Sequence, residues 1–147
     1  MDIGFRFEVI YKDSDLLEVR VSAWNGAFGG TADVYVGIGQ LEETAAKLKG
    51  FPKHPSDTRE IMLGSFDPKM AGGGASMQFY CTDASGHAYV ESKIKSNSLP
   101  GKPVQCVILL LPIEAAAVDS FVNELRLLGL HKTGVARLEG APTAVRS

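Results

Sequence analysis

The start of the chain alternates between apolar and polar side chains. In residues 3–11 the apolar side chains recur at every second position, and the same period returns in residues 16–24. A period of two is typical of a β-strand that has one face in the core. Between the two segments, Asp13 and Asp15 favour a turn because their short side chains hydrogen-bond to the nearby backbone. We therefore expect a β-hairpin here.

Burial and charge together select one register for this hairpin. The favoured register places three pairs opposite one another: Tyr11 with Leu17, Phe7 with Val21, and Glu8 with Arg20. The first two pairs share the apolar face, and the third is an attractive pair on the polar face. A slip of the strands would instead bring two glutamates together, so it is disfavoured.

The rest of the pattern predicts further strands and two helices. Strands are indicated at residues 31–38, 59–66, 76–82, 87–95 and 104–111. Apolar residues at helical spacing predict helices over residues 41–50 and 113–128, and Gly50 and Gly129 are the expected C-terminal stops. The unbroken apolar run at 104–111 predicts a central strand covered on both faces.

Because hairpin-length connections predominate, we predict an α+β domain. It has one mostly antiparallel sheet of about seven strands, in the order βββα-ββββα, covered by two helices. Residues 1–130 form this single domain, and residues 131–147, which have little apolar pattern, are expected to be a flexible tail. We interpret the glycine run at 72–74 as a mobile hairpin tip, with a pocket-lining loop as the alternative.

The composition is that of a globular protein and argues against a nucleic-acid partner. The 147 residues carry 17 acidic and 15 basic side chains, which gives a net charge of −2 and a pI of about 5.9. Nucleic-acid-binding domains usually have a basic face or a much higher pI. The N-terminus does not resemble a secretory signal, and the longest apolar run, residues 107–112, is too short to span a bilayer. We expect a cytoplasmic protein without membrane contact.

Side chains that carry chemistry are scattered along the chain. Cys81 and Cys106 lie in apolar, strand-like segments, and we interpret them as buried free thiols; a disulfide or a catalytic thiol is the alternative. The three histidines are too far apart for a zinc motif. Gly37 and Gly39 lack the rest of a dinucleotide fingerprint. The sequence therefore predicts no catalytic residue, no cofactor and no metal.

Two pairs of residues are candidates for an interaction surface. Trp24 and Phe28 flank a glycine-rich turn, and aromatic side chains are enriched at protein interfaces. Their alternative role is structural, with Trp24 under a helix and Phe28 at the edge of the core. Lys93 and Lys95 lie on one face of a strand, where they either prevent that strand from pairing with another chain or form a docking face for an acidic partner.

Several segments, in their order along the chain, carry a resemblance to a known family. They are the early strand Leu16–Val21, the helix Leu41–Gly50, the segment Ser76–Tyr80, and the run Val104–Leu111 leading into the helix Ile113–Leu128. The arrangement resembles the bacterial immunity proteins of the WapI family. It departs from them in lacking a tryptophan-bearing first helix and in a longer glycine loop at 71–74. The resemblance implies binding and neutralisation of a toxin domain, without catalysis or cofactor.

We therefore expect a non-catalytic, immunity-like domain that binds a toxin-like protein. The alternative is a small-molecule-binding protein or an enzyme with a pocket between sheet and helices. Polar groups on the neighbouring strands would then serve that pocket: Gln78, Tyr80, His87 and Tyr89.

Overall fold

The computed structural model describes residues 2–85 and 87–141 of the chain. In these residues the chain forms eight strands and two helices, which confirms the predicted α+β class. The strands are β1 (Gly4–Lys12), β2 (Leu16–Trp24), β3 (Gly29–Gly37), β4 (Thr58–Gly64), β5 (Gly74–Cys81), β6 (His87–Lys95), β7 (Cys106–Glu114) and β8 (Val135–Glu139). The helices are α1 (Gln40–Leu48), between β3 and β4, and α2 (Ala115–His131), between β7 and β8.

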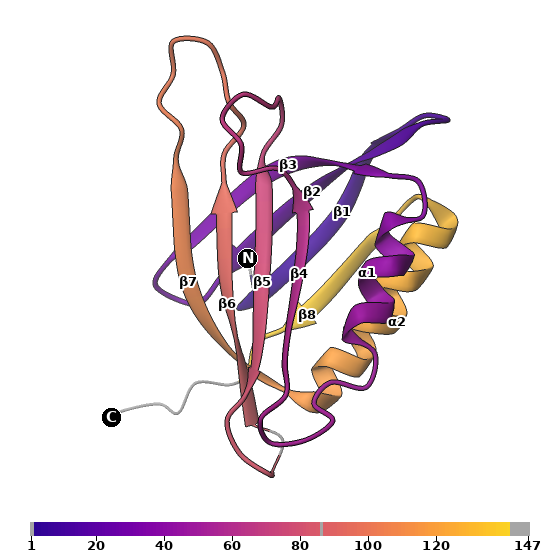
Figure 1. The fold of residues 1–147 in the computed structure, drawn as a ribbon, viewed down its shortest axis with the longest axis vertical. Coiled ribbons are helices and arrows are strands. Elements are labelled where there is room, and N and C mark those ends of the chain that lie inside the picture. The colour runs from indigo at the N-terminus through magenta and orange to yellow at the C-terminus, as the bar shows by residue number, and fades with distance from the viewer. Residues whose placement is uncertain (1, 86, 142–147) are drawn as a thin grey trace.

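The strands divide into two antiparallel sheets rather than one. Sheet A has the order β3-β2-β1-β8, and sheet B has the order β4-β5-β6-β7. Figure 1 shows the strands of sheet B in front, the strands of sheet A crossing behind them, and α1 and α2 side by side at one side of both sheets. Each sheet therefore has one inner face, which is covered, and one outer face.

The register of the first hairpin is largely as predicted. Phe7 lies opposite Val21 and Glu8 opposite Arg20, but Tyr11 lies opposite Glu18 rather than Leu17. The cause is a register shift between Val9 and Tyr11, which turns the tyrosine out of the core and leaves it 51% exposed. The prediction for Tyr11 was therefore wrong.

Five phenylalanine rings fill the space between the sheets and the helices. Phe121 of α2 packs edge-on against Phe5 and Phe7 of β1, with ring centroids 5.1 and 5.4 Å away. Phe79 of sheet B packs edge-on against Phe5 and also against Phe51, which follows α1. All five side chains are fully buried. One continuous core therefore joins both sheets to both helices.

The glycine run at 72–74 is a buried junction between the two sheets and not a mobile hairpin tip. Gly72 has a φ of +85°, and the N–H of Gly73 donates to the carbonyl of Asp33 on β3 at 2.8 Å. A Cβ atom on Gly73 would lie 2.6 Å from the carbonyl oxygen of Lys95. Glycine is needed here because three backbone segments meet without room for a side chain.

Strand β7 is an edge strand of sheet B and not the central strand that its apolar run predicted. Leu109 and Leu111 are buried, whereas Ile108 and Leu110 between them are 60% and 53% exposed. The apolar run led to the wrong prediction because both faces of the strand are apolar, although only the inner face is covered. This strand continues through Pro112 to Glu114, so the last helix begins at Ala115 and not at residue 113 as predicted.

The C-terminal region contains a strand, so the prediction of a flexible tail from residue 131 was wrong for its described part. Strand β8 pairs with β1, and Ala136 and Leu138 are buried in the core. Gly129 does not end the last helix, which continues to His131. Instead it allows close packing of the helices, because a Cβ there would meet Leu41 and Glu42 of α1. Residues 142–147 lie outside the described residues.

Candidate protein-interaction surface

The outer face of sheet B carries three rows of side chains that run across its four strands. The pairing registers give these rows as Met62–Ser76–Lys93–Ile108, Glu60–Gln78–Glu91–Leu110 and Thr58–Tyr80–Tyr89–Pro112. No helix covers this face in Figure 1, where α1 and α2 lie to one side of it. The side chains on this face alternate between apolar, aromatic and charged groups.

A strip of apolar and aromatic side chains follows β7 and turns onto the tyrosine row. We define this β7–tyrosine strip by its five members: Ile108, Leu110, Pro112, Tyr89 and Tyr80. The two aliphatic side chains are more than half exposed. Exposed aliphatic groups next to aromatic rings, with charged groups beside them, are typical of surfaces that bind another protein.

The two tyrosines form one end of this strip. Tyr80 and Tyr89 stack with their ring centroids 5.1 Å apart and their planes 29° from parallel. Partial burial raises the pKa of Tyr80, and the neighbouring carboxylate of Glu91 raises that pKa further. The phenol therefore stays neutral and available as a hydrogen-bond donor at physiological pH.

Charged groups border the strip and are held in place on the face. The Nζ atom of Lys93 lies 4.9 Å from the centre of the Phe66 ring, as expected of a cation–π contact. The hydroxyl of Ser76 hydrogen-bonds to Glu60 at 3.2 Å. The strip is thus bordered by one positive group and two negative groups, Glu60 and Glu91.

The outer face of sheet A has a different character. There Arg20 makes a bidentate contact with Asp33, with N–O distances of 2.9 and 3.2 Å. On the same face Glu8 lies opposite Arg20, and the hydroxyl of Thr31 hydrogen-bonds to that of Ser22. These polar groups satisfy one another, whereas Tyr11 and Tyr35, on either side of Glu18, are 51% and 44% exposed.

The predicted aromatic pair, Trp24 and Phe28, is split by the structure. Trp24 is partly buried against Gly29, where a Cβ atom would lie 2.8 Å from the indole. Phe28 is 63% exposed at the turn between β2 and β3. This turn is fastened to β7, because the Asn25 side chain donates to the carbonyl of Leu110 at 3.0 Å. Phe28 therefore lies next to the strip, whereas Trp24 does not belong to it.

The predicted lysine pair is also split. Lys93 is exposed on the outer face of sheet B, but Lys95 is only 4% exposed and its ammonium lies 3.4 Å from the hydroxyl of Ser98. The segment around Ser98 reaches the ammonium at this end of β6, where the side chain is buried. Lys95 is therefore not part of an exposed docking face, and that part of the prediction was wrong.

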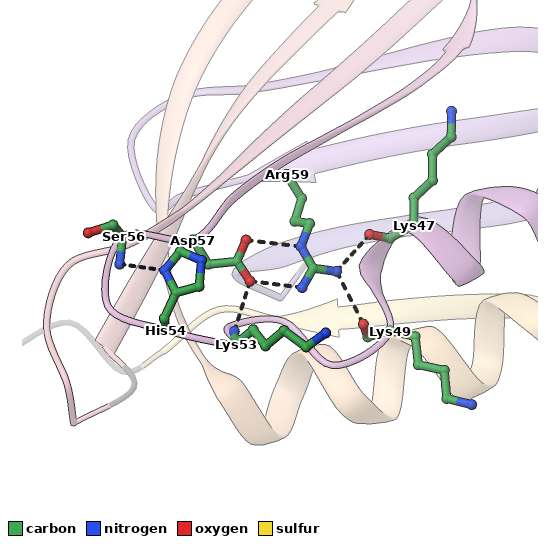
Figure 2. A network of polar contacts seen from close by, with 7 residues as sticks. All are labelled: Lys47, Lys49, Lys53, His54, Ser56, Asp57 and Arg59. Atoms are coloured by element: carbon green, nitrogen blue, oxygen red, sulfur yellow. Dashed lines mark hydrogen bonds and ion pairs between the residues drawn. The ribbon is translucent and has the colours of Figure 1, made fainter.

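Sequence reasoning missed a largely buried ion pair at the start of β4, shown in Figure 2. Arg59 makes two contacts with Asp57, at 3.0 and 2.8 Å, and donates to the carbonyls of Lys47 and Lys49 at the end of α1. Asp57 also accepts from the backbone N–H of Lys53. The hydrogen bonds from Arg59 lower the pKa of Asp57. The sequence did contain a signal for this ion pair, because Arg59 occupies one of the alternating inward-facing positions of β4.

Potentially reactive groups near the β5–β6 turn do not converge. His87 binds the carboxylate of Asp83 at 2.9 Å, which lowers the pKa of Asp83, and both side chains are largely exposed. Cys81 instead packs against the core, with its thiol donating to the backbone carbonyl of Asp83. A shallow pocket of about 340 Å³ beside it includes His54, yet no hydrogen bond joins this histidine to the thiol among the described residues. Cys106, expected to be buried, is exposed.

Other kinds of site find little support in the part of the chain that the structure describes. In residues 2–85 and 87–141, no three His, Cys, Asp or Glu side chains come together as metal ligands. Neither helix in those residues has the length and apolar character needed to cross a membrane. Comparisons with protein-family models, curated proteins and solved structures gave no match to this chain.

Proposed function

We propose that this protein is a non-catalytic protein-binding domain that uses the β7–tyrosine strip as its contact surface. The observation that carries the proposal is the exposure of Ile108 and Leu110 beside the stacked pair of Tyr80 and Tyr89. Burial of such groups drives association, and tyrosine is among the residues that contribute most at interfaces. As part of the proposal, the partner is a toxin-like protein and the setting is a bacterial cytoplasm.

The chemistry of the strip indicates which partner surface would fit it. An aliphatic or aromatic patch would cover Ile108 and Leu110, and a carbonyl or carboxylate would accept a hydrogen bond from a tyrosine hydroxyl. The side chains of Glu91 and Lys93, next to the strip, would select for opposite charges at the border. Such a partner surface has an apolar centre and a polar rim.

The alternative of a pocket between sheet and helices has weaker support. Phenylalanine rings fill that space, including Phe5, Phe79 and Phe121. The polar side chains that would serve the pocket lie elsewhere: Gln78, Tyr80, His87 and Tyr89 are on the outer face of sheet B or at its end. These groups are therefore better placed to contact a second protein than a ligand held between the layers.

The test is capture of a binding partner with matched surface variants. We expect the wild type and a Tyr35→Ala control, on the outer face of sheet A, to capture the same protein from the native organism. Leu110→Lys and Tyr80→Ala should weaken binding of that protein by about tenfold or more. Equal binding by all four proteins, or no captured protein, would contradict the proposal. Binding assays with purified toxin domains then test the class of partner.

A thermal-shift screen against metabolites distinguishes the proposed protein-binding function from the alternative of a small-molecule site. A protein-binding domain of this kind should show no rise in melting temperature with any small molecule. A clear rise with one chemical class would favour a ligand pocket, because a ligand that binds only the folded state stabilises it.

A further inference from the structure

The alternating hydrogen bonds of sheet B show which backbone groups of β7 face away from the sheet. Just beyond β6, the N–H of Ser96 donates to the carbonyl of Gln105, in the register that continues along the β6–β7 pair. In an antiparallel pair the bonded positions alternate, so the odd-numbered residues of β7 bond to β6. The even-numbered residues, beginning with Cys106 and Ile108, therefore direct their N–H and carbonyl groups outward. Pro112, which has no N–H to donate, is at one of these outward positions.

Part of this outward edge is already occupied. The carbonyl of Leu110 accepts from the side chain of Asn25 at 3.0 Å, and the carbonyl of Pro112 accepts from the N–H of Ala141 at 2.7 Å. Within residues 2–85 and 87–141, the outward groups of Cys106 and Ile108 have no such partner. The N-terminal half of β7 is thus an open strand edge.

On the edge strands of sheet A, in contrast to this part of β7, outward backbone groups have hydrogen-bond partners. The carboxylate of Glu124 accepts from the N–H of Arg137 on β8 at 2.8 Å. On β3, the carbonyl of Asp33 accepts from Gly73, and the N–H of Gly37 donates to the side chain of Gln40. Side chains or loops therefore hydrogen-bond to outward-facing backbone groups on both edge strands of that sheet.

The open part of β7 is accessible and carries no charge. Cys106 is exposed, Ile108 is 60% exposed, and Val104 just before the strand is 43% exposed. A groove of about 140 Å³ lies beside this stretch, between its first residues and the start of β3. No charged side chain occurs from residue 104 to residue 113. Charged residues are the usual device that keeps an edge strand from pairing, and here they are missing.

We propose that the open edge of β7 pairs antiparallel with the same edge of a second copy of this chain, about a two-fold axis at Cys106. This axis sets Cys106 opposite Cys106 of the second copy and Ile108 opposite Val104 of the second copy. It avoids Leu110, whose carbonyl Asn25 already binds. The side chains that pair around the axis are those of Val104, Cys106 and Ile108, which are all uncharged, so no like charges oppose each other there.

The pairing joins the two copies of sheet B into one continuous antiparallel sheet. The two-fold axis is perpendicular to that sheet, so both outer faces lie on the same side and the two β7–tyrosine strips become neighbours. The dimer requires only a second copy of the chain, so it does not depend on the proposed partner.

Sedimentation equilibrium under reducing conditions tests the pairing. The wild type should have twice the 15.7 kDa mass of one chain. Cys106→Lys and Cys106→Glu should each be monomeric, because they place like charges opposite each other at the axis. An equimolar mixture of the two variants should recover the dimer mass, since opposite charges then face each other. Circular dichroism checks that each variant is folded.

Two controls locate the contact. Met62→Lys introduces a charge on the same outer face but on β4, and it should remain dimeric. Under oxidising conditions Cys81→Ser should still form a disulfide-linked dimer, whereas Cys106→Ser should not. A monomeric wild type would overturn the proposal. Dimers that persist in both charged Cys106 variants, or a mixture that stays monomeric, would also overturn it.

Discussion

Arg59 and Asp57 form a bidentate ion pair, and Arg59 also hydrogen-bonds the start of β4 to the end of α1. The guanidinium binds both carboxylate oxygens, at 3.0 and 2.8 Å, and its remaining donor reaches two backbone carbonyls of the helix end. The Asp57 side chain is only 9% exposed and the Arg59 side chain 21% exposed. Because the pair is largely shielded from water, its electrostatic attraction is screened little. Removal of one residue would leave the other without its counter-charge.

Removal of one member should therefore destabilise the protein markedly. We expect Arg59→Ala to lower the free energy of unfolding by about 3 kcal/mol, because Asp57 is left buried without its cation and two helix carbonyls lose their donor. Urea denaturation measures the change. The matched control is Arg20→Ala, which breaks a bidentate pair of similar geometry whose arginine is 46% exposed; it should have little effect. Equal losses in the two variants would show that burial is not the deciding factor.

The same pair should make stability depend on acid pH in a defined direction. The hydrogen bonds from Arg59 lower the pKa of Asp57 below its ordinary value of 3.8. The contribution of this carboxylate is therefore fully present above pH 3.8 and is lost as the pH falls through the lower, folded-state pKa. We expect the stability difference between the wild type and Asp57→Asn to be constant near neutral pH and to shrink in the acid range. Urea titrations at a series of pH values measure it, and a difference that grows on acidification would contradict this assignment.

The glycine junction predicts a strong effect of adding one methyl group. A Cβ on Gly73 would lie 2.6 Å from the backbone carbonyl of Lys95 and 2.9 Å from the side chain of Ala32. Because neither neighbour can move without shifting a strand, Gly73→Ala should cost about 1–3 kcal/mol of stability. At Gly37, the last residue of β3, the nearest heavy atom to an added Cβ is 4.0 Å away on the flexible side chain of Gln40. Gly37→Ala should thus be tolerated, and a similar loss in both variants would argue against close packing at the junction.

The sequence contained enough information for the fold class and for most strands. The period of two identifies β1, β2 and β6 because each has one apolar face and one polar face. The period of two failed to place β7, since both faces of that strand are apolar and only the elements packed against it decide which face is covered. Pairing partners far apart in sequence are not visible in a local pattern. For the same reason one sheet was predicted where there are two.

The candidate surface was only partly predictable. Lys93 and Phe28 were recognised as exposed candidates, but the strip itself depends on Tyr80, Tyr89 and β7 lying side by side, which is a property of sheet order. Lys95 shows the opposite case: a charged side chain at an outward position is buried, and the segment that carries Ser98 contacts its ammonium. Local sequence thus indicates which side chains could be outside, and tertiary contacts decide which ones are.

Strand β8 gives the last prediction, because it replaces an expected tail with a part of the core. Leu138 is 1% exposed and lies opposite Phe5 on β1, whereas Leu130 near the end of α2 is 58% exposed. Leu138→Ala should lower the free energy of unfolding by about 2–5 kcal/mol, since it leaves a cavity in a packed layer. Leu130→Ala should change it by less than about 0.5 kcal/mol. Urea denaturation of both variants makes the comparison. Amide hydrogen exchange provides a second measure: the N–H groups of β8 that bond to β1 should exchange as slowly as those of β1 itself, and fast exchange across residues 135–139 would show that the strand does not belong to the folded core.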